Sequence, residues 1–526
     1  MNQLVIAPLL VALVTAILTL LVRSVPSVQR GTSMLGGVGY VVAVAALWAE
    51  VDPLGASNVV PYQVGDWRAP YGITLVADSL SVFMLALAAV VSLAALAFSI
   101  RYVDEFGQRL SYHPLYHFML VGVTGSFLTG DIFNLFVWFE VMLMSSYVLV
   151  VFYSGPEHTR AALQYVVLNL IGSAVMLLAI GGIYATTGTL NMADLARRLA
   201  NPTAYGLQDP ASVYPVLGLS ALLFAVFALK AGIVPFQFWV PPAYRAAPAP
   251  VSAMLAGVVK KVGVYAIIRL YFTVFSALEL GELALPGFGG NSVLSFFGPV
   301  MFVMAAASIL LGGLGAVGRD DIDGLLAYSS IGQVGFIVLP LAVGATVPEV
   351  RTLAIAAALV YALNHALAKG LLFLVSGSVL SSVGSIRFAD LGGLTRKDPV
   401  LSGVFFVGAL SLIGIPPLSG FFGKLLVFDV AGRAGATLAL ALALAGAILT
   451  IAYFSRAWNR GFWGPESAMV ERGAPATGVV VVAALAVLVL LVGVGFDPVF
   501  RAAESAARAA TESQGYVDAV LGGGAA

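Results

Sequence analysis

The stretch that decides the fold is NLFVWFEVMLMSSYVLVVF, residues 134–152, in which Glu140 is the one charged residue. An apolar run of about 20 residues is long enough to cross the hydrocarbon core of a bilayer as a helix. The composition extends this interpretation to the whole chain, because 60% of its 526 residues are hydrophobic and only 10% are charged. Soluble domains carry roughly 25% charged residues. The chain is therefore predicted to be an all-α integral membrane protein in a lipid bilayer.

Several classes of function are excluded by what the sequence lacks. The formal net charge is zero, which gives no indication of nucleic acid as a partner. There is no cysteine, so disulfides, thiolate metal sites and cysteine nucleophiles are excluded. No phosphate-binding glycine loop ending in Gly-Lys-Ser/Thr is present, which argues against direct use of ATP. We therefore expect neither a cofactor nor an enzyme.

Fourteen apolar runs are candidate membrane helices, centred near residues 13, 42, 88, 121, 142, 173, 226, 261, 305, 334, 366, 415, 447 and 487. The first run has no basic residues before it and no cleavage site after it, so we expect a retained helix rather than a signal peptide. The odd-numbered loops hold thirteen basic residues, and the even-numbered loops with the tail hold seven. Because cytoplasmic loops are enriched in lysine and arginine, both termini are predicted to lie outside. Residues 500–526 are expected to form a short surface helix followed by disorder.

Glu140 is the one acidic residue that lies clearly in the middle of an apolar run. Six basic residues also lie inside the apolar runs: Lys230, Lys260, Lys261, Arg269, Lys369 and Lys424. A charge at the centre of a membrane helix costs roughly 2.5–3.5 kcal/mol. These side chains should therefore line an interior path, pair with one another or lose their charge. Burial favours the neutral forms of both carboxyl and amino groups, which makes a proton relay possible. Static ion pairs that lock helices together remain the alternative.

Position along the helix refines the expectation for individual charges. Lys260 and Lys261 are adjacent and point about 100° apart on a helix, so at most one is expected to face a given interior. Arg269 lies toward a helix end and is expected to extend to the interface. Asp78 and Asp131 lie near helix ends and are also expected to reach the interface.

Two helices are predicted to be broken by proline. Pro235 follows Lys230 by five residues, and Pro416 and Pro417 precede Lys424 by two turns. Proline removes a backbone donor and clashes with the preceding turn. Because Pro235 and Pro416 lie 181 residues apart in corresponding halves of the chain, they indicate internal repeats with ion sites near the middle of the membrane.

The histidines fall into two groups. His365 and Lys369 are four residues apart and share a helix face. Histidine titrates near neutral pH, so His365 could carry a proton between lysines, although a plain hydrogen-bonding role is an open alternative. His113 and His117 have a spacing that could hold a metal, but no suitable third ligand is nearby, so no metal site is predicted. Their position at a helix start favours the interface.

Five stretches resemble the antiporter-like subunits shared by respiratory complex I and Mrp-type cation/proton antiporters: GDIFNLFVWFEVMLMSSY (130–147), FALKAGIVPFQFWVPPAYRAAPAPVSAMLAGVVKKVGVYAIIR (227–269), LLAYSSIGQVGF (325–336), NHALAKGLLFL (364–374) and LIGIPPLSGFFGKLLV (412–427). The resemblance implies fourteen helices, two inverted five-helix repeats, broken helices 7 and 12, and a polar axis through the membrane interior. The corresponding organisation is an N-terminal three-helix segment (1–100), two repeats (101–290 and 291–462), and a final helix with a tail (463–526).

The resemblance also implies roles for particular residues. Glu140 of the fifth helix would pair with Lys230 of the seventh, with Lys261 in the eighth helix and Lys424 in the twelfth. His365 and Lys369 would lie on the linking eleventh helix. One departure is Pro242, where many family members have an acid.

Within this family, three further stretches resemble the D-type subunits of Mrp antiporters: MNQLVIAPLLVALVTAIL (1–18), GDWRAPYGITLVADSLS (65–81) and YFSRAWNRGFWG (453–464). This implies a proton-translocating subunit that exchanges H⁺ for Na⁺ in a bacterial plasma membrane, driven by the proton motive force. The implied partners are a larger homologous subunit and several small membrane subunits. Two alternatives remain open: a pump subunit of an NADH–quinone oxidoreductase or membrane-bound hydrogenase, and a non-conducting scaffold.

Overall fold

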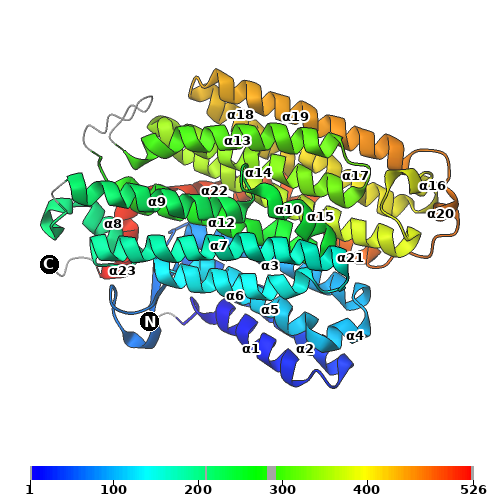
Figure 1. The fold of residues 1–526 in the computed structure, drawn as a ribbon, viewed down its shortest axis with the longest axis horizontal. Helices are drawn as coiled ribbons and strands as arrows, with labels where there is room; N and C mark the ends of the chain where they lie inside the picture. The colour runs from blue at the N-terminus through cyan, green and yellow to red at the C-terminus, as the bar shows by residue number, and fades with distance from the viewer. Residues whose placement is uncertain (1–2, 208–209, 281–291, 523–526) are drawn as a thin grey trace.

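The chain forms a bundle of long helices that run along one common direction (Figure 1). The computed structural model describes residues 3–207, 210–280 and 292–522. The all-α prediction needs one addition, a short antiparallel hairpin of β1 (Val60–Gln63) and β2 (Thr74–Ala77). In the described residues, ten helices are long and apolar enough to cross a membrane, or eleven if one bent pair counts as a span.

The helices used below are, in chain order, α1 (Ala7–Leu21), α2 (Pro26–Val51), α3 (Ser79–Tyr102), α4 (Glu105–Gly107), α5 (His113–Leu128), α6 (Ile132–Val150), α7 (Pro156–Thr187), α8 (Met192–Ala200), α9 (Pro210–Ala231), η4 (Gln237–Trp239), α10 (Val240–Ala246), α11 (Ala249–Met254), η5 (Leu255–Val259), α12 (Lys260–Ile267), η6 (Ile268–Val274), η7 (Phe275–Ala277), α13 (Val293–Val317), α14 (Ile322–Thr346), α15 (Arg351–Val383), α16 (Leu394–Lys397), α17 (Pro399–Ile413), α18 (Ser419–Arg433), α19 (Thr437–Ala457), α20 (Ala468–Glu471), α21 (Val479–Val494), α22 (Phe496–Thr511) and α23 (Ser513–Leu521). The segments α11 to η7 form one continuous helical span, Ala249–Ala277.

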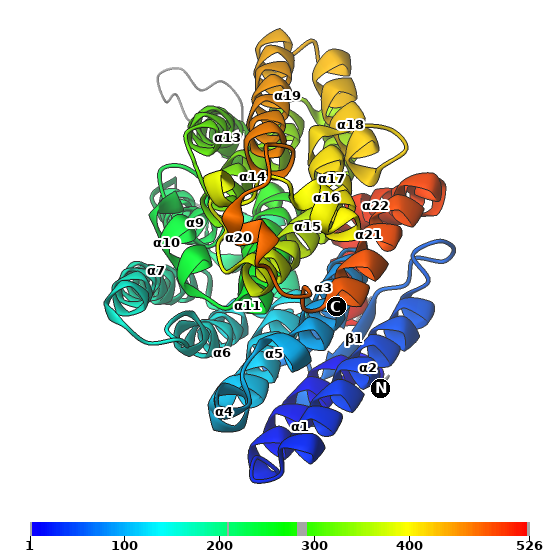
Figure 2. The ribbon, with the colours of Figure 1, turned by 90° about the vertical axis from the view of Figure 1, so that its right-hand side faces the viewer.

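The fourteen predicted apolar runs all fall on this bundle. Thirteen of their centres lie within helices, and the run centred near residue 415 falls on the break between α17 and α18. The four runs beyond the ten long spans correspond to α1, α5, the broken pair α17–α18 and the bent pair α21–α22. Viewed end on, α15 lies in the middle of the bundle, with α6 and α7 on one flank and α18 and α19 on another (Figure 2).

Two helix hairpins, α5–α6 and α13–α14, share one local design. Asp131 caps α6 and Asp321 caps α14, and each carboxylate accepts a hydrogen bond from the backbone N–H three residues on, as N-cap residues do. Asp131 also pairs through the backbone with Asn191, and Asp321 pairs likewise with Arg387. The first pair lies beside α8 and the second close to α16, and these helices lie at opposite ends of the bundle (Figure 1).

Both predicted helix breaks are present, and glycine begins each of them. α9 and α17 are followed by Gly232 (φ 68°) and Gly414 (φ 94°), and such left-handed glycines terminate helices without a Cβ clash. The sequences are Gly-Ile-Val-Pro-Phe from residue 232 and Gly-Ile-Pro-Pro-Leu from residue 414. Counted from the glycine, Pro235 therefore corresponds to Pro417.

The C-terminal region begins with a surface helix, as predicted: in α22 the charged side chains Asp497, Arg501 and Arg508 are exposed, while the opposite face packs onto the bundle. α21 and α22 meet at a bend of 78°. α22 packs against α3 and α15 through a face of small buried side chains, Ala502, Ala503, Ala506, Ala507 and Ala510. Alanine at helical spacing lets two helices approach closely, which composition alone does not distinguish from a loosely folded tail. The predicted disorder at residues 523–526 and the predicted repeat boundary at residues 290/291 lie outside the described residues.

Candidate functional site

The site is a set of ionisable side chains that lies across the bundle, transverse to the helix axes. We call it the polar row, and it consists of Glu140 on α6, Lys230 on α9, Lys261 on α12, His365 and Lys369 on α15, and Lys424 on α18. The four lysines and the histidine are at most 4% exposed, whereas Glu140 is partly buried. The row therefore extends from one flank of the bundle through the central helix α15 to another flank (Figure 2).

At the α6 end, the row is held by side chains of α7. The Ser173 hydroxyl donates a hydrogen bond to Glu140. Lys230 Nζ donates to the Tyr165 hydroxyl at 3.3 Å and lies 5.6 Å and 5.8 Å from the ring centroids of Tyr165 and Trp239, within the range of cation–π attraction. The ion pairs of the described residues do not include the Glu140–Lys230 pair that the resemblance implies. Each of these two charges instead contacts a different residue of α7.

The backbone groups freed by the two breaks are satisfied by side chains. At the first break, Trp239 Nε1 donates to the Leu229 carbonyl at 2.7 Å, and the Val234 N–H donates to Ser308 Oγ at 2.9 Å. At the second break, Lys424 Nζ donates to the Ile413 carbonyl at 3.0 Å. Irregular backbone at membrane depth is tolerated where its polar groups are buried in protein in this way.

The centre of the row is a cluster of two lysines, a serine and a histidine. Lys261 Nζ is hydrogen-bonded to His365 Nδ1 and donates to the Ala256 carbonyl at 2.7 Å. His365 Nε2 lies 3.2 Å from Ser330 Oγ. Lys260 Nζ donates to the carbonyl and hydroxyl oxygens of Ser330 at 3.3 Å and 3.4 Å.

The expectation that at most one of the adjacent lysines faces a given interior is therefore wrong. The span 249–277 is buried on all sides and packs against both α14 and α15 in the region of the cluster. Two side chains that leave this helix about 100° apart thus both enter protein interior. Their length lets them converge on Ser330 and His365.

Beyond His365, a chain of hydroxyl and amide groups continues the row. Lys369 Nζ donates to Ser329 Oγ at 2.8 Å, and that hydroxyl donates to the Tyr453 hydroxyl at 2.8 Å. Gln333 Nε2 also donates to the Tyr453 hydroxyl at 2.8 Å, and Tyr361 donates to Gln333 Oε1. The hydrogen-bonded chain thus runs from Lys369 to Tyr361.

Lys424 is adjacent to the end of this chain. The Tyr361 ring packs against Phe336 with centroids 5.5 Å apart, and Lys424 Nζ lies 5.1 Å from the Phe336 centroid. The second break is also tied to α15, because Asn364 Oδ1 accepts hydrogen bonds from Ser411 and Ser419 at 2.7 Å and 2.9 Å. The hydroxyl and amide members of the network were not predicted, since serine and tyrosine recur throughout apolar helices and carry no distinguishing spacing.

The lysines of the row are held by neutral groups. Every ion pair among the described residues involves an arginine. The buried lysines contact carbonyl, hydroxyl and imidazole groups instead. In this part of the chain, the alternative that the lysines form static ion pairs therefore has no support.

Arg269 and Asp78 do form a buried pair, which corrects the expectation that both reach the interface. Arg269 Nη2 lies 2.7 Å from Asp78 Oδ1, and both side chains are 1% exposed. The guanidinium also contacts the rings of Tyr265 and Tyr516, with centroids at 5.5 Å and 5.0 Å. Because Tyr516 belongs to α23, the C-terminal helices cover a helix end that the sequence alone would place at the membrane surface.

His113 and His117 are buried, which also differs from the expected interface position. The Ser33 hydroxyl lies 2.9 Å from His113 Nδ1 and 2.9 Å from His117 Nε2. Among the described residues, no group of three or more histidine, cysteine, aspartate or glutamate side chains could hold a metal. The pair is therefore part of the packing between α2 and α5.

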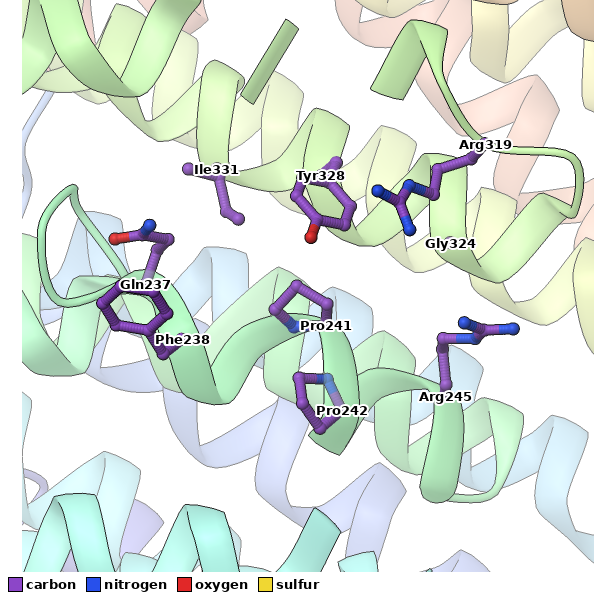
Figure 3. A pocket seen from close by; sticks show the side chains of 9 residues that line it. All are labelled: Gln237, Phe238, Pro241, Pro242, Arg245, Arg319, Gly324, Tyr328 and Ile331. Carbon is purple, nitrogen blue, oxygen red and sulfur yellow. The ribbon is translucent and has the colours of Figure 1, made fainter. Parts of the chain in front are cut away.

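A surface pocket of about 310 Å³ lies between η4–α10 and the beginning of α14 (Figure 3). Its charged lining residues are Arg245 and Arg319; Arg245 pairs with Asp321 at 3.3 Å, and Arg319 stacks on Tyr328 at 4.3 Å. Pro242 also lines the pocket.

Comparisons with known proteins place this geometry in a family. Residues 129–450 match the family model described as NADH:quinone oxidoreductase/Mrp antiporter, TM. The chain is 34% identical to the D-type subunit of the Na⁺/H⁺ antiporter of Alkalihalophilus pseudofirmus over 99% of this chain and 100% of that one. It is 37% identical to the N-type subunit of the NADH-quinone oxidoreductase of Desulforudis audaxviator over 90% and 88% of the two chains.

A solved structure agrees with these relatives. A chain in the Mrp complex of a Dietzia species is 28% identical and superposes with a TM-score of 0.85, covering 99% of this chain and 100% of that one. The chain is a multi-pass membrane protein that belongs to the NADH:quinone oxidoreductase/Mrp antiporter family of membrane subunits, and it is similar over nearly its whole length to the D-type subunits of Na⁺/H⁺ antiporters.

Proposed function

We propose that this chain is the D-type subunit of an Mrp antiporter and that protons cross the membrane interior along the polar row in exchange for Na⁺. The observation that carries the proposal is the row itself, a buried series of proton-holding groups that passes both helix breaks. A buried lysine that only stabilises the fold is best paired with a carboxylate, which offsets the desolvation cost of its charge. The lysines of the row instead have only neutral hydrogen-bond partners. A lysine held in this way can release its proton without leaving a buried carboxylate unpaired.

The proposed path alternates between hydrogen-bonded segments and flexible lysines. One segment joins Lys230 to the α7 side chains, and another joins Lys369 to Tyr361. Lys230 and Lys424 lie at the two breaks, where their four-carbon stems can move the amino group between neighbours. The membrane potential contributes about 2.3 kcal/mol per charge per 100 mV, which is enough to bias proton transfer in one direction.

The topology that we propose has fourteen spans, with inverted repeats at 101–290 and 291–462 between the flanking segments 1–100 and 463–526. Two observations support it: the matched caps Asp131 and Asp321 belong to opposite ends of the bundle, and the Gly-Ile-x-Pro break occurs once in each repeat. The excess of basic residues in the odd loops puts those loops in the cytoplasm of a bacterial cell and both termini outside. The beginning of α1 and α23 lie toward the same end of the bundle, in keeping with this orientation (Figure 1).

We further propose that neighbouring subunits, a larger homologue and several small membrane proteins, lie against this chain. Glu140 supports this proposal, because it is partly exposed on the isolated chain at membrane depth. A carboxylate facing lipid there is costly. A subunit packed on α6 would remove that cost and could exchange a proton with Glu140.

The test is Na⁺-driven proton movement in everted vesicles that carry the complete complex. Glu140→Gln retains a side-chain oxygen that can accept the Ser173 hydrogen bond but holds no titratable proton, so exchange is expected to stop while the complex stays assembled. Lys230→Ala is expected to behave likewise. Glu140→Asp is the matched control and is expected to keep part of the activity. Wild-type exchange by Glu140→Gln would overturn the relay.

The alternative is a pump subunit of an NADH–quinone oxidoreductase or membrane-bound hydrogenase, which the 37% identity to an N-type subunit of such an oxidoreductase favours. Purification of the tagged chain with its native partners separates the two functions. A larger homologue and several small membrane subunits support the antiporter, whereas flavin- and iron–sulfur-bearing partners support the redox pump. A scaffold without conduction would instead lose assembly, rather than transport, in the Glu140→Gln variant.

A further inference from the structure

Lys260 is a buried lysine that the family resemblance does not assign to the axis. Its side chain is fully buried in α12, and its amino group has two neighbours of different kinds. A Cβ atom placed on Gly232 would lie 3.1 Å from Lys260 Nζ, so the amino group lies against the backbone of the first helix break. On its other side, Nζ donates to Ser330 at 3.3 Å and 3.4 Å.

Ser330 connects Lys260 to His365. The Ser330 hydroxyl is 3.2 Å from His365 Nε2, while the other ring nitrogen, Nδ1, is hydrogen-bonded to Lys261. The two nitrogens of one imidazole thus face two adjacent lysines, one directly and one through a hydroxyl. This arrangement matches the chemistry of a proton carrier, because a hydroxyl both accepts and donates and an imidazole can be protonated on either nitrogen.

The electrostatics of the cluster favour movement of a proton over storage of several. Lys260, Lys261, Lys369 and His365 lie close together, and the ion pairs of the described residues supply none of them with a carboxylate. Like charges in a medium of low dielectric constant repel strongly. A proton that arrives on one of these groups therefore favours the departure of a proton from another.

We propose that Lys260 is an additional proton-carrying residue that receives protons at the α9 break and delivers them to His365 through Ser330; this inference rests on the proposed function. The Lys260 ammonium gives one proton to Ser330 Oγ, whose own proton passes to His365 Nε2. His365 then gives its Nδ1 proton to the neutral amine of Lys261. One proton has moved from Lys260 to Lys261, and the imidazole is left in its other tautomer.

The experiment measures Na⁺-driven proton exchange in everted vesicles with the whole complex, for Lys260→Met and Lys260→Arg. Both variants are expected to lower the initial rate on the order of 100-fold, the usual contribution of a positioned proton-transfer group. Arginine keeps the charge but does not release its proton, so it separates proton transfer from a static positive charge. An active Lys260→Arg, or a wild-type rate in Lys260→Met, would overturn the proposal.

Ser330 provides a second test that leaves both lysines in place. Ser330→Ala removes the connecting hydroxyl and is expected to slow exchange as Lys260→Met does, whereas Ser330→Thr keeps the hydroxyl and most of the rate. The double variant Lys260→Met/Ser330→Ala should be no slower than either single variant, since both interrupt one step. Equal rates for Ser330→Ala and Ser330→Thr would refute the proposal, even if the Lys260 variants fail to assemble.

The Glu140→Gln variant, measured in parallel, separates this inference from the proposed function. Inactive Glu140→Gln with fully active Lys260→Met would remove Lys260 from the path and leave the antiporter proposal standing. Activity in both variants would reject the proposed relay as a whole.

Discussion

Replacing Asp78 by asparagine is expected to lower the free energy of unfolding by about 3–5 kcal/mol, the usual cost of breaking a buried ion pair from one side. Asp78 and Arg269 are both 1% exposed and lie 2.7 Å apart, so the arginine cannot reach water when its partner is neutralised. Asp78 Oδ1 also accepts a hydrogen bond from the Ser81 N–H at the beginning of α3. Asparagine caps helices about as well as aspartate. The decrease in the free energy of unfolding therefore reports the loss of the charge and not the loss of the helix cap.

The matched control is Asp429→Asn on α18. Asp429 forms a pair of similar length with Arg433, 2.9 Å, but the two side chains are 36% and 66% exposed. Exposed pairs contribute about 0–1 kcal/mol, so this variant should be nearly as stable as the parent. Adding Arg269→Met to Asp78→Asn should recover part of the lost stability, because it removes the uncompensated cation.

The assay is reversible unfolding of the purified chain in mixed micelles with increasing SDS, followed by tryptophan fluorescence. The midpoint for Asp78→Asn should lie well below that of Asp429→Asn. If the two midpoints coincide, the Asp78–Arg269 pair does not hold the beginning of α3 to the span 249–277, and the argument from burial is wrong.

Two further variants test the packing around the polar row. Tyr453→Phe removes the hydroxyl that accepts from Ser329 and Gln333; it should cost about 1–3 kcal/mol per buried donor left unpaired and slow exchange in everted vesicles, and an unchanged rate would exclude this hydroxyl from the path. Gly420→Ala places a Cβ in a steric clash with the Ser411 carbonyl oxygen and should reduce the amount of complex on native gels. Gly432→Ala on the same helix meets nothing within 4 Å and should not reduce it, so equal yields would contradict the packing at the second break.

The interior position of the main lysines could be derived from the sequence because one strong physical effect decides it. A charge in hydrocarbon is so costly that Lys230, Lys261 and Lys424 had to lie inside the protein, and all three are buried. The two helix breaks could also be predicted from the sequence, since proline cannot continue a helix. Their exact form depends on Gly232 and Gly414, which end each helix before its proline.

Lys260 and Arg269 were misjudged because the rules applied to them are local. The angular rule for adjacent residues assumes that a helix has one inner face, but the span around Lys260 is enclosed on all sides. The rule for arginine assumes that a helix end meets water, but Tyr516 of α23 covers Arg269. Both outcomes depend on segments that are distant in sequence.

The hydroxyl groups of the network could not be recognised without the fold. Ser329, Ser330 and Tyr453 have no unusual spacing, and serine in a membrane helix most often bonds to its own backbone one turn back. Their significance arises from contacts between α14, α15 and α19, such as the hydrogen bond from Ser329 to Tyr453. Such contacts follow from tertiary packing and leave no periodic signal.

The alanine face of α22 has a consequence for how the protein is made. Thr273 Oγ1 donates a hydrogen bond to the Ala510 carbonyl, and the Ser505 hydroxyl donates one to Ser79. α22, which is synthesised late, thus forms hydrogen bonds with η6 and the beginning of α3, which are synthesised much earlier. Until α22 leaves the ribosome and docks, the flanks of α3 and α15 that it covers stay open to lipid. A chain interrupted by a premature stop codon would keep this open flank, which would give membrane proteases a means to distinguish incomplete copies from finished ones.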